Sequence, residues 1–184
     1  MNIRSNFKFI LLAAGLVCAS QSKAAGVGVD RVYLVSPSGT YMKTNDEGIG
    51  LPEVVDTKTE ADRYDLNLHF KGFGNNNQNC LEDKDIIKVK QYLADQILFV
   101  VDEKEPLIDT AEFYDDLPKT SGEISDLFYI VSDTSGCIGV NSTVKLSAVP
   151  LSGDYYIYFP DVNPSARWTW VDQSESGTEI TLIR

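Results

Sequence analysis

The residues best suited to hold a ligand lie in one aromatic-rich stretch near the end of the chain. Residues 155–173 contain six of the nineteen aromatic residues, and four of these recur at a spacing of two, which places them in pairs on single strand faces. Tyrosine and arginine often anchor interfaces, and acidic and amide groups supply hydrogen bonds. We therefore expect a contact surface for a protein or a glycan, formed by Tyr156, Tyr158 and Arg167 together with Asp161 and Asn163.

The same stretch also fits a purely structural role. If residues 155–159 and 167–171 form neighbouring strands, Trp168 and Trp170 share one face, and burying such a side chain is worth about 1.5–3 kcal/mol or more. That face and Ile157 should then lie in the core. Tyr156 and Tyr158 would point outward in either case.

Groups suited to catalysis are scarce. His69 is the only histidine, and its place on the polar side of an alternating stretch predicts a solvated ring rather than the base of a triad. Asp115 and Asp116 are adjacent, so on a strand they point to opposite faces and cannot form the facing pair that glycoside hydrolysis needs. Neither an EF-hand spacing nor a nucleotide-binding motif occurs. We predict a non-enzymatic protein with no catalytic residues, no metal and no other cofactor.

The chain begins with the features of a secretory signal peptide. Arg4 and Lys8 precede a short apolar run, and small residues end the segment at Ala24. We predict a signal peptide over residues 1–24 and a single β-rich domain over residues 25–184, secreted or periplasmic. A lipoprotein lipidated at Cys18 is the alternative, although bulky Leu16 and Val17 stand where a lipidation signal has small residues. No apolar run is long enough for a stable membrane span.

Cys80 and Cys137 are the two cysteines that remain after residue 24. An even pair in an exported protein predicts a disulfide bond. Closing so long a loop is worth about 4 kcal/mol in the chain-entropy model. Two cysteines and one histidine cannot complete the usual structural zinc site.

The charge balance excludes one class of partner. The chain has 16 basic and 27 acidic residues. Loss of residues 1–24 would remove three basic residues and no acid, leaving 13 basic residues and a net charge of −14. Such a surface repels phosphate backbones, so we expect no nucleic-acid partner.

The pattern of apolar residues predicts a mainly β fold. Residues 64–71 alternate, which places Tyr64, Leu66, Leu68 and Phe70 on a buried face and His69 and Lys71 in water. We predict a β-sandwich or open barrel of eight or nine short antiparallel strands, without an internal sequence repeat. The expected strands are residues 31–35, 40–43, 64–71, 97–101, 126–133, 142–149, 155–159, 167–171 and 178–183.

One segment has a helical rather than an alternating spacing. Ile86, Val89, Leu93 and Ile97 recur at intervals of three and four, and acidic residues precede them. We predict an α-helix over about residues 82–96, packed on the side of the sheet.

These features favour an exported binding or interaction protein that works by protein–protein or glycan contact, such as an adhesin-like subunit, an inhibitor or a periplasmic protective factor. A secreted toxin or effector acting on membranes is one alternative, because amphipathic strands such as residues 64–71 can insert into lipid. A carboxylate-dependent glycan hydrolase is the other, and it requires two acids facing each other across a pocket.

Overall fold

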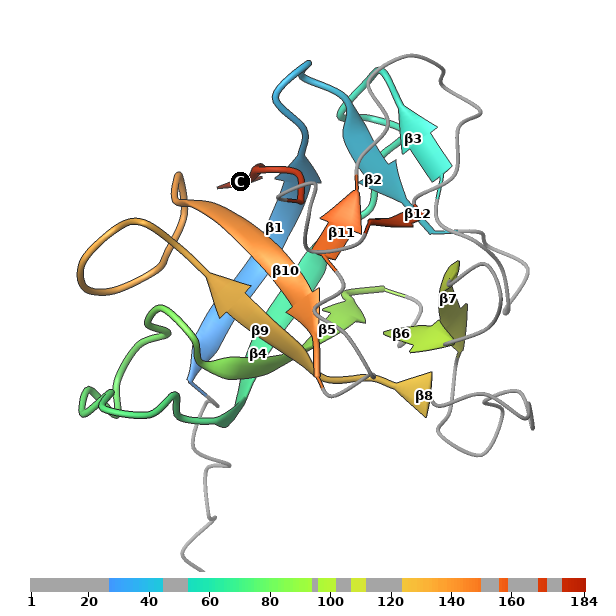
Figure 1. Ribbon diagram of the computed structural model, residues 1–184. Coiled ribbons are helices and arrows are strands. Elements are labelled where there is room, and N and C mark those ends of the chain that lie inside the picture. Colours follow the sequence, from blue (N-terminus) through green and yellow to red (C-terminus); the bar gives the residue numbers. More distant parts are fainter. Residues whose placement is uncertain are drawn as a thin grey trace, which may run out of the picture.

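The computed structural model describes residues 27–44, 53–93, 96–101, 107–111, 124–149, 156–158, 169–171 and 177–184. These residues form thirteen β-strands and no helix (Figure 1). The prediction of a mainly β fold is therefore confirmed. The strands are β1 (Gly28–Val35), β2 (Tyr41–Lys43), β3 (Glu53–Val55), β4 (Tyr64–Phe70), β5 (Ile86–Gln91), β6 (Ile97–Val101), β7 (Leu107–Ala111), β8 (Ile124–Ser125), β9 (Phe128–Val131), β10 (Thr143–Ala148), β11 (Tyr156–Tyr158), β12 (Thr169–Val171) and β13 (Ile180–Ile183).

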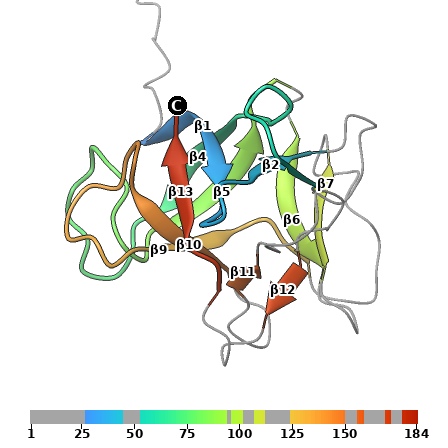
Figure 2. The same cartoon turned by 90° about the horizontal axis from the view of Figure 1, so that it is seen from above.

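Six strands close into an antiparallel barrel. They follow one another around it in the order β1, β4, β5, β9, β10 and β13, and β13 pairs with β1 to complete the ring. The first part of β1, as far as Val32, pairs with β4. The second part, from Tyr33, pairs with β13. Figure 2 shows β13 lying beside β1. Closure leaves these strands without a free edge.

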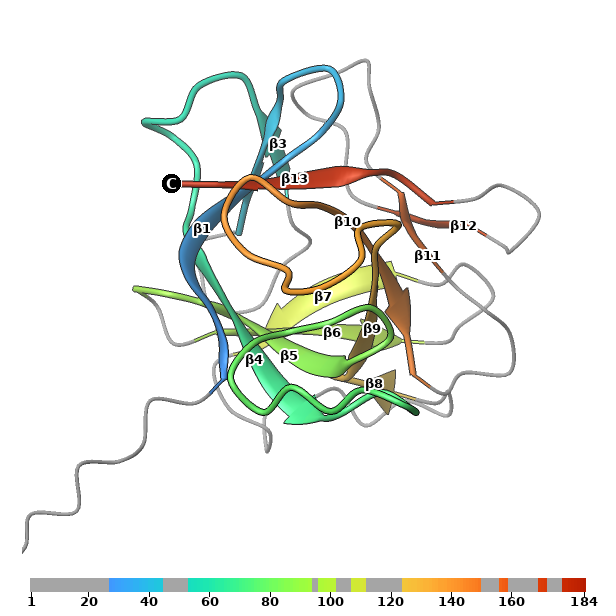
Figure 3. The same ribbon diagram turned by 90° about the vertical axis from the view of Figure 1, so that its left-hand side faces the viewer.

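Most of the other strands form hairpins, and each hairpin lies between two successive barrel strands along the chain. Hairpin β2–β3 lies between β1 and β4, β6–β7 between β5 and β9, and β11–β12 between β10 and β13. The short strand β8 adds to β6. The described chain thus runs three times through a barrel strand, a hairpin and a second barrel strand (Figure 3). This three-fold topology is that of a β-trefoil, and it arises without a visible sequence repeat.

The core fills the barrel with side chains from every barrel strand. Each barrel strand contributes at least one fully buried side chain, and these include Val32, Leu66, Val89, Ile130, Leu146 and Leu182. Strand β10 pairs with β13 at its start and is buried on both sides near its end, where β9 and β11 flank it. Packing of this kind makes the barrel a rigid base for the loops that leave it.

The prediction of a helix over residues 82–96 is wrong. Residues 86–91 form β5, whose residues alternate between half-buried and buried positions, the spacing of a strand. Strand β5 pairs with β4 over most of its length and with β9 at its start. Leu93, which the helical spacing placed in the core, is 85 % exposed. Pairing on both edges satisfies more backbone groups than a marginal helix of this length would.

The expected alternation of residues 64–71 holds for the first half of β4 and then reverses. Tyr64 and Leu66 are buried, but Phe70 is exposed, and the side chain of Lys71 is only 14 % exposed. The pairing of β4 with β5 shifts register between Leu68 and Phe70. Such a bulge turns the following side chains to the opposite face, so Phe70 points to water and Lys71 points inward.

The disulfide forms as predicted. Cys80 and Cys137 are bonded, with 5.5 Å between their Cα atoms. They join the loop between β4 and β5 to the loop between β9 and β10, which lie side by side in Figures 1 and 3. Beside the disulfide, Leu81 and Ile138 are buried and form an isolated β-bridge.

Candidate functional site

Only part of the predicted contact surface lies in the described residues. Tyr156 is described with its side chain, and Tyr158 is described by its place in β11. Asp161, Asn163 and Arg167 lie outside the described residues. Of the five predicted residues, Tyr156 is thus the one whose side-chain surroundings the structure describes.

The two aromatic strands are neighbours, as the sequence suggested. Strand β11 pairs with β12, and Ile157 lies directly opposite Trp170. Ile157 is fully buried, whereas Tyr156, one position away, is half-buried. The strand thus turns its apolar residue to the core and Tyr156 toward the surface.

Tyr156 is fixed in place by the chain that leads into β13. Gly177 has φ +42°, and a Cβ atom added to it would lie 2.5 Å from the Cβ of Tyr156. Glycine is therefore required for this close approach. The next residue, Thr178, donates its backbone N–H to the carbonyl of Ile157 at 3.0 Å. Tyr156 consequently packs against backbone on this side.

A polar hollow of about 520 Å³ lies on one side of Tyr156. Val131 and Val144 contribute apolar surface to it. Its polar lining comes from the β9–β10 hairpin and the residue just before β13, and consists of Ser132, Asp133, Thr134, Thr143, Lys145 and Glu179. Hydroxyl, carboxylate and ammonium groups therefore meet beside one tyrosine ring.

An apolar hollow of about 410 Å³ shares Tyr156 and Val131 with the polar one. Its apolar lining includes Phe73, Ile86 and Tyr129. Phe73 stands fully exposed at the tip of the loop after β4, and Tyr129 is 38 % exposed. Lys71, Gly72, Lys84 and Ser147 complete the lining. We call the two hollows together the Tyr156 groove.

One rim of the Tyr156 groove, loop 71–85, is organised by the buried carboxylate of Asp85. Its Oδ1 accepts hydrogen bonds from the N–H of Gly72 at 2.8 Å and from the side chain of Asn75 at 2.7 Å. Its Oδ2 accepts from Lys71 Nζ and from the N–H of Glu82, both at 2.8 Å. Four donors from one loop thus converge on a single side chain.

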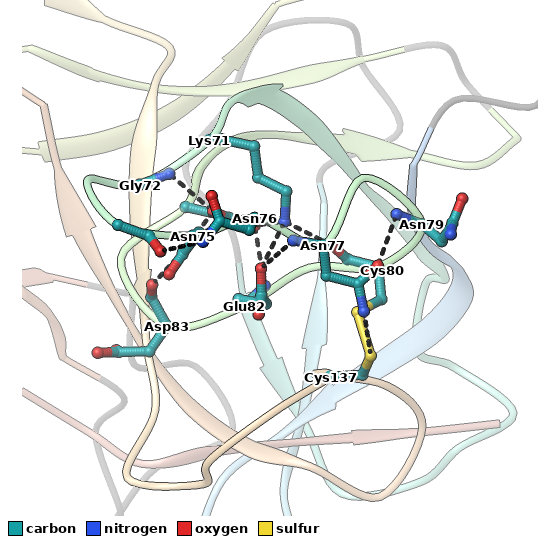
Figure 4. Close-up of polar contacts among 12 residues, drawn as sticks. Lys71, Gly72, Asn75, Asn76, Asn77, Asn79, Cys80, Glu82, Asp83 and Cys137 are labelled. Atoms are coloured by element: carbon teal, nitrogen blue, oxygen red, sulfur yellow. Dashed lines mark hydrogen bonds and ion pairs between the residues drawn. A yellow bond between two sulfur atoms is a disulfide. The ribbon is translucent and has the colours of Figure 1, made fainter.

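Lys71 is the cation of this cluster. Its Nζ donates to the carbonyl of Cys80 at 2.7 Å and to the carboxylate of Glu82 at 3.2 Å, in addition to Asp85. Figure 4 shows the Lys71 side chain reaching toward Glu82 and Cys80, with the asparagines of the loop around it. The charge of Lys71 is therefore used within the protein.

The pKa values reflect this pairing. Burial acts to raise the pKa of Asp85, but the hydrogen bonds that the carboxylate accepts outweigh that effect and lower the pKa. Burial acts to lower the pKa of Lys71, but its bonds to Asp85 and Glu82 outweigh that effect and raise the pKa. Both groups are held in their charged forms.

The loop is also fastened to the barrel. The N–H of Lys84 donates to the carbonyl of Ile130 at 2.7 Å, and the N–H of Ile130 donates to the carbonyl of Asp85 at 2.9 Å. The carboxylate of Asp83 accepts the N–H of Ser132 at 2.9 Å. Together with the disulfide, these bonds fix loop 71–85 against β9 and the hairpin that lines the polar hollow.

Sequence reasoning proposed Tyr156 as a contact residue but did not point to the residues that surround it. Asp133 and Glu179 are 46 positions apart and become neighbours in one lining only because β13 pairs with β10. Phe73 and Tyr129 line the same hollow because β5, which follows the loop of Phe73, pairs with β9. The one available signal was local, namely an exposed aromatic residue between two glycines in a polar loop.

Two further observations concern membranes and metals. Within the described ranges, no helix has the length and apolar character needed to cross a bilayer. In that same part of the chain, no three histidine, cysteine, aspartate or glutamate residues are grouped as metal ligands would be. His69 is exposed and lies beside the ring of Phe70, with 4.3 Å between the ring centroids.

Comparison with known proteins identifies the fold. The sequence matches no protein-family model and no curated protein. A structure of a Caenorhabditis elegans protein with unknown function is similar at 12 % identity and a TM-score of 0.58, covering 89 % of this chain and 98 % of that one. The SDF2-like protein from Arabidopsis thaliana is similar at 11 % identity and a TM-score of 0.55, covering 86 % and 95 %. At such identities the likeness establishes the fold alone.

Proposed function

We propose that this protein is an exported, non-enzymatic binding protein whose ligand is a glycan held in the Tyr156 groove. The observation that carries the proposal is the pair of hollows, one polar and one apolar, that share Tyr156 and Val131. The disulfide and the predicted signal peptide support the exported part.

The chemistry of the groove suits a sugar. A pyranose has an apolar C–H face that stacks on an aromatic ring, and hydroxyl groups at its edge that need hydrogen-bonding partners. The ring of Tyr156 stands next to acceptors and donors in the polar hollow, such as Ser132, Asp133 and Glu179. The volumes of about 520 and 410 Å³ lie within the usual range of ligand sites.

The rigidity of the groove favours binding over induced rearrangement. Its floor consists of barrel strands, Tyr156 packs against backbone at Gly177, and its rim is held by Asp85 and the disulfide. A site that is already ordered loses little conformational entropy on binding.

The test is a glycan array probed with the oxidised protein lacking residues 1–24, followed by calorimetry on the best saccharide. We expect Tyr129→Ala and Tyr156→Ala each to weaken binding at least tenfold, since each removes a ring from the groove. Leu93→Ala is the matched control, because Leu93 is an exposed apolar residue at the opposite end of β5 from the groove. Thermal melting of each variant separates lost binding from lost folding.

Two results would contradict the glycan proposal. One is the absence of any saccharide that binds saturably. The other is capture of a protein from the organism's envelope whose binding is lost in Phe73→Ala while saccharides have no effect, which would make the groove a protein-binding surface. Dye release from liposomes by the same protein would instead favour the membrane-acting toxin.

A carboxylate-dependent hydrolase is the second candidate, favoured by the presence of Asp133 and Glu179 in one hollow. Both residues are exposed, whereas a general acid normally works in a water-excluded site. The measurement is release of reducing sugar from bound saccharides. Turnover that disappears in both Asp133→Asn and Glu179→Gln would establish the hydrolase, and binding without turnover would leave the first proposal standing.

A further inference from the structure

A second cleft lies apart from the Tyr156 groove, where β13 ends beside β1. It encloses about 410 Å³ and is lined by Asp30, Arg31, Arg63 and Arg184. Arg31 comes from β1, Arg63 immediately precedes β4, and Arg184 follows β13. Figure 3 shows the end of β13 alongside β1. We call this the arginine cleft.

The backbone places Arg31 in the cleft at a conformational cost. Arg31 has φ 56°, in the left-handed region that non-glycine residues seldom adopt. It lies where the pairing of β1 with β4 shifts register, between Val29 and Val32. The carboxylate of Asp65 accepts its backbone N–H at 2.8 Å and so holds this geometry. Residues in such strained conformations concentrate at functional sites.

Two of the three arginines of the cleft lie against aromatic rings. The guanidinium of Arg31 lies 4.6 Å from the centre of the Tyr92 ring. Arg63 lies 5.4 Å from the centre of the Tyr33 ring and donates from Nε to the Tyr33 hydroxyl at 3.0 Å. Cation–π contacts of this kind orient a guanidinium without neutralising its charge.

Carboxylates do not neutralise these groups. In the part of the chain that the structure describes, none of the three guanidinium groups forms an ion pair. Lys58, which lies 5.0 Å from the centre of the Tyr33 ring, donates to the backbone carbonyl of Arg184 and adds a further positive charge. The lining includes one acidic side chain, that of Asp30, and the carboxylate of Asp65 lies at the backbone of Arg31, so the cationic side chains outnumber the acidic ones here.

We propose that the arginine cleft is a binding site for an oxyanion, that is, a carboxylate, phosphate or sulfate group. Several donors in fixed forks match the oxygens of such a group. An anion in the cleft would also relieve the mutual repulsion of the three arginines. The attraction acts between exposed cations and the anion, and salt screens such interactions, so the affinity should fall as salt is added.

The test is a titration of the oxidised protein, isotope-labelled for NMR, with inorganic phosphate, sodium sulfate and glucuronate at low ionic strength, and with neutral glucose for comparison. We expect at least one of the anions to cause saturable shifts at the amides of Val32, Tyr64 and Tyr92, and glucose to cause none there. Binding of glucuronate without phosphate would identify the source as a carboxylate, and the reverse would identify a phosphate.

Three variants decide whether the arginines carry the binding. Arg31→Gln and Arg63→Gln should each weaken the affinity about tenfold, the value of one charge-assisted hydrogen bond. Lys43→Gln removes the same charge outside the cleft and should change the affinity less than twofold. The proposal is overturned if no anion gives saturable shifts, or if Lys43→Gln weakens binding as much as the arginine variants do. Unchanged amide spectra away from the cleft would show that the variants are folded.

Discussion

The charged side chains of loop 71–85 and those of the arginine cleft differ in the partners that they contact within the protein. Lys71 contacts two carboxylates and a carbonyl, and Asp85 accepts four hydrogen bonds. In the arginine cleft, all three arginines are exposed, and the guanidinium groups of Arg31 and Arg63 lie over aromatic rings. The first arrangement uses its charges within the protein, whereas the second leaves its charges available for a ligand.

The two regions also occupy comparable places in the three-fold fold. Loop 71–85 joins the first unit to the second, and it is clamped to the loop that joins the second unit to the third by Cys80 and Cys137. The arginine cleft lies at the remaining junction, where β13 meets β1. We infer that the buried charges of loop 71–85 serve stability, whereas the exposed charges of the arginine cleft serve recognition, and the predictions below test that division.

Removing the disulfide should have the largest effect on stability. Cys80→Ser with Cys137→Ser opens a loop of 57 residues, which is worth about 4 kcal/mol in the chain-entropy model. The measurement is the free energy of unfolding from denaturant titration. A loss below about 1 kcal/mol would show that the loop contacts alone hold this junction and would weaken the comparison.

Asp85→Asn should cost about 3 kcal/mol. The change leaves Lys71 without its best partner and removes the carboxylate that four donors share, and breaking a buried pair on one side costs about 3–5 kcal/mol. We expect the lower end, because the Lys71 side chain keeps 14 % exposure and a second partner in Glu82. Asp56→Asn, which alters an exposed carboxylate, is the control and should change stability by less than about 0.5 kcal/mol.

The pH dependence of the same pair supplies a third prediction. The pKa of Asp85 is lower in the folded protein than in the unfolded chain, so its contribution is present above the ordinary value of about 3.9 and is lost as pH falls through the folded pKa. The difference in unfolding free energy between the wild type and Asp85→Asn should therefore shrink below about pH 4. A difference that stays constant down to pH 2 would rule out the carboxylate as its cause.

The sequence predicted the mainly β fold because most strands alternate or are fully apolar. It misassigned residues 82–96 because Ile86, Val89 and Leu93 fit a helical spacing, while the decisive hydrogen bonds come from β4 and β9, which are distant in sequence. The bulge before Phe70 was equally invisible, since it depends on pairing rather than on residue type. Local patterns thus predicted the class of fold, whereas pairing between distant segments determined the strand at residues 86–91 and the bulge before Phe70.

The candidate site shows the same limit. Tyr156 could be proposed from the sequence, because the spacing of aromatic residues along a strand is a local pattern. Its polar neighbours Asp133 and Glu179, and the three arginines of the cleft, come from segments that meet only when the barrel closes. The three-fold repeat of the structure is not visible in the sequence, because each core position of the barrel accepts several apolar residue types.

Gly72→Ala tests how closely loop 71–85 packs, with an expected cost of about 2 kcal/mol. A Cβ atom at Gly72 would lie 2.6 Å from the backbone oxygen of Lys84, so either the loop or the start of β5 must move, and overpacking typically costs 1–3 kcal/mol. Gly74→Ala is a useful contrast, because nothing lies within 4 Å of its added Cβ and its φ of +89° alone opposes the change. Gly72 does not have a positive φ, so a loss below about 0.5 kcal/mol in Gly72→Ala would show that the loop yields at little cost and is not closely packed.

Arg63→Gln should have the smallest effect on stability, about 0.5 kcal/mol, because Arg63 itself is exposed and the change removes one part-buried hydrogen bond and a cation–π contact at Tyr33. The same substitution is expected to weaken oxyanion binding about tenfold. Asp85→Asn should show the opposite pattern, with a large loss of stability and little change in the oxyanion affinity of the molecules that remain folded. The free energy of unfolding and the oxyanion affinity should both be measured for both variants, because the two regions are expected to differ in opposite directions on the two measurements. If Arg63→Gln costs as much stability as Asp85→Asn, the arginines brace the β13–β1 junction, and the division between structural and recognition charges does not hold.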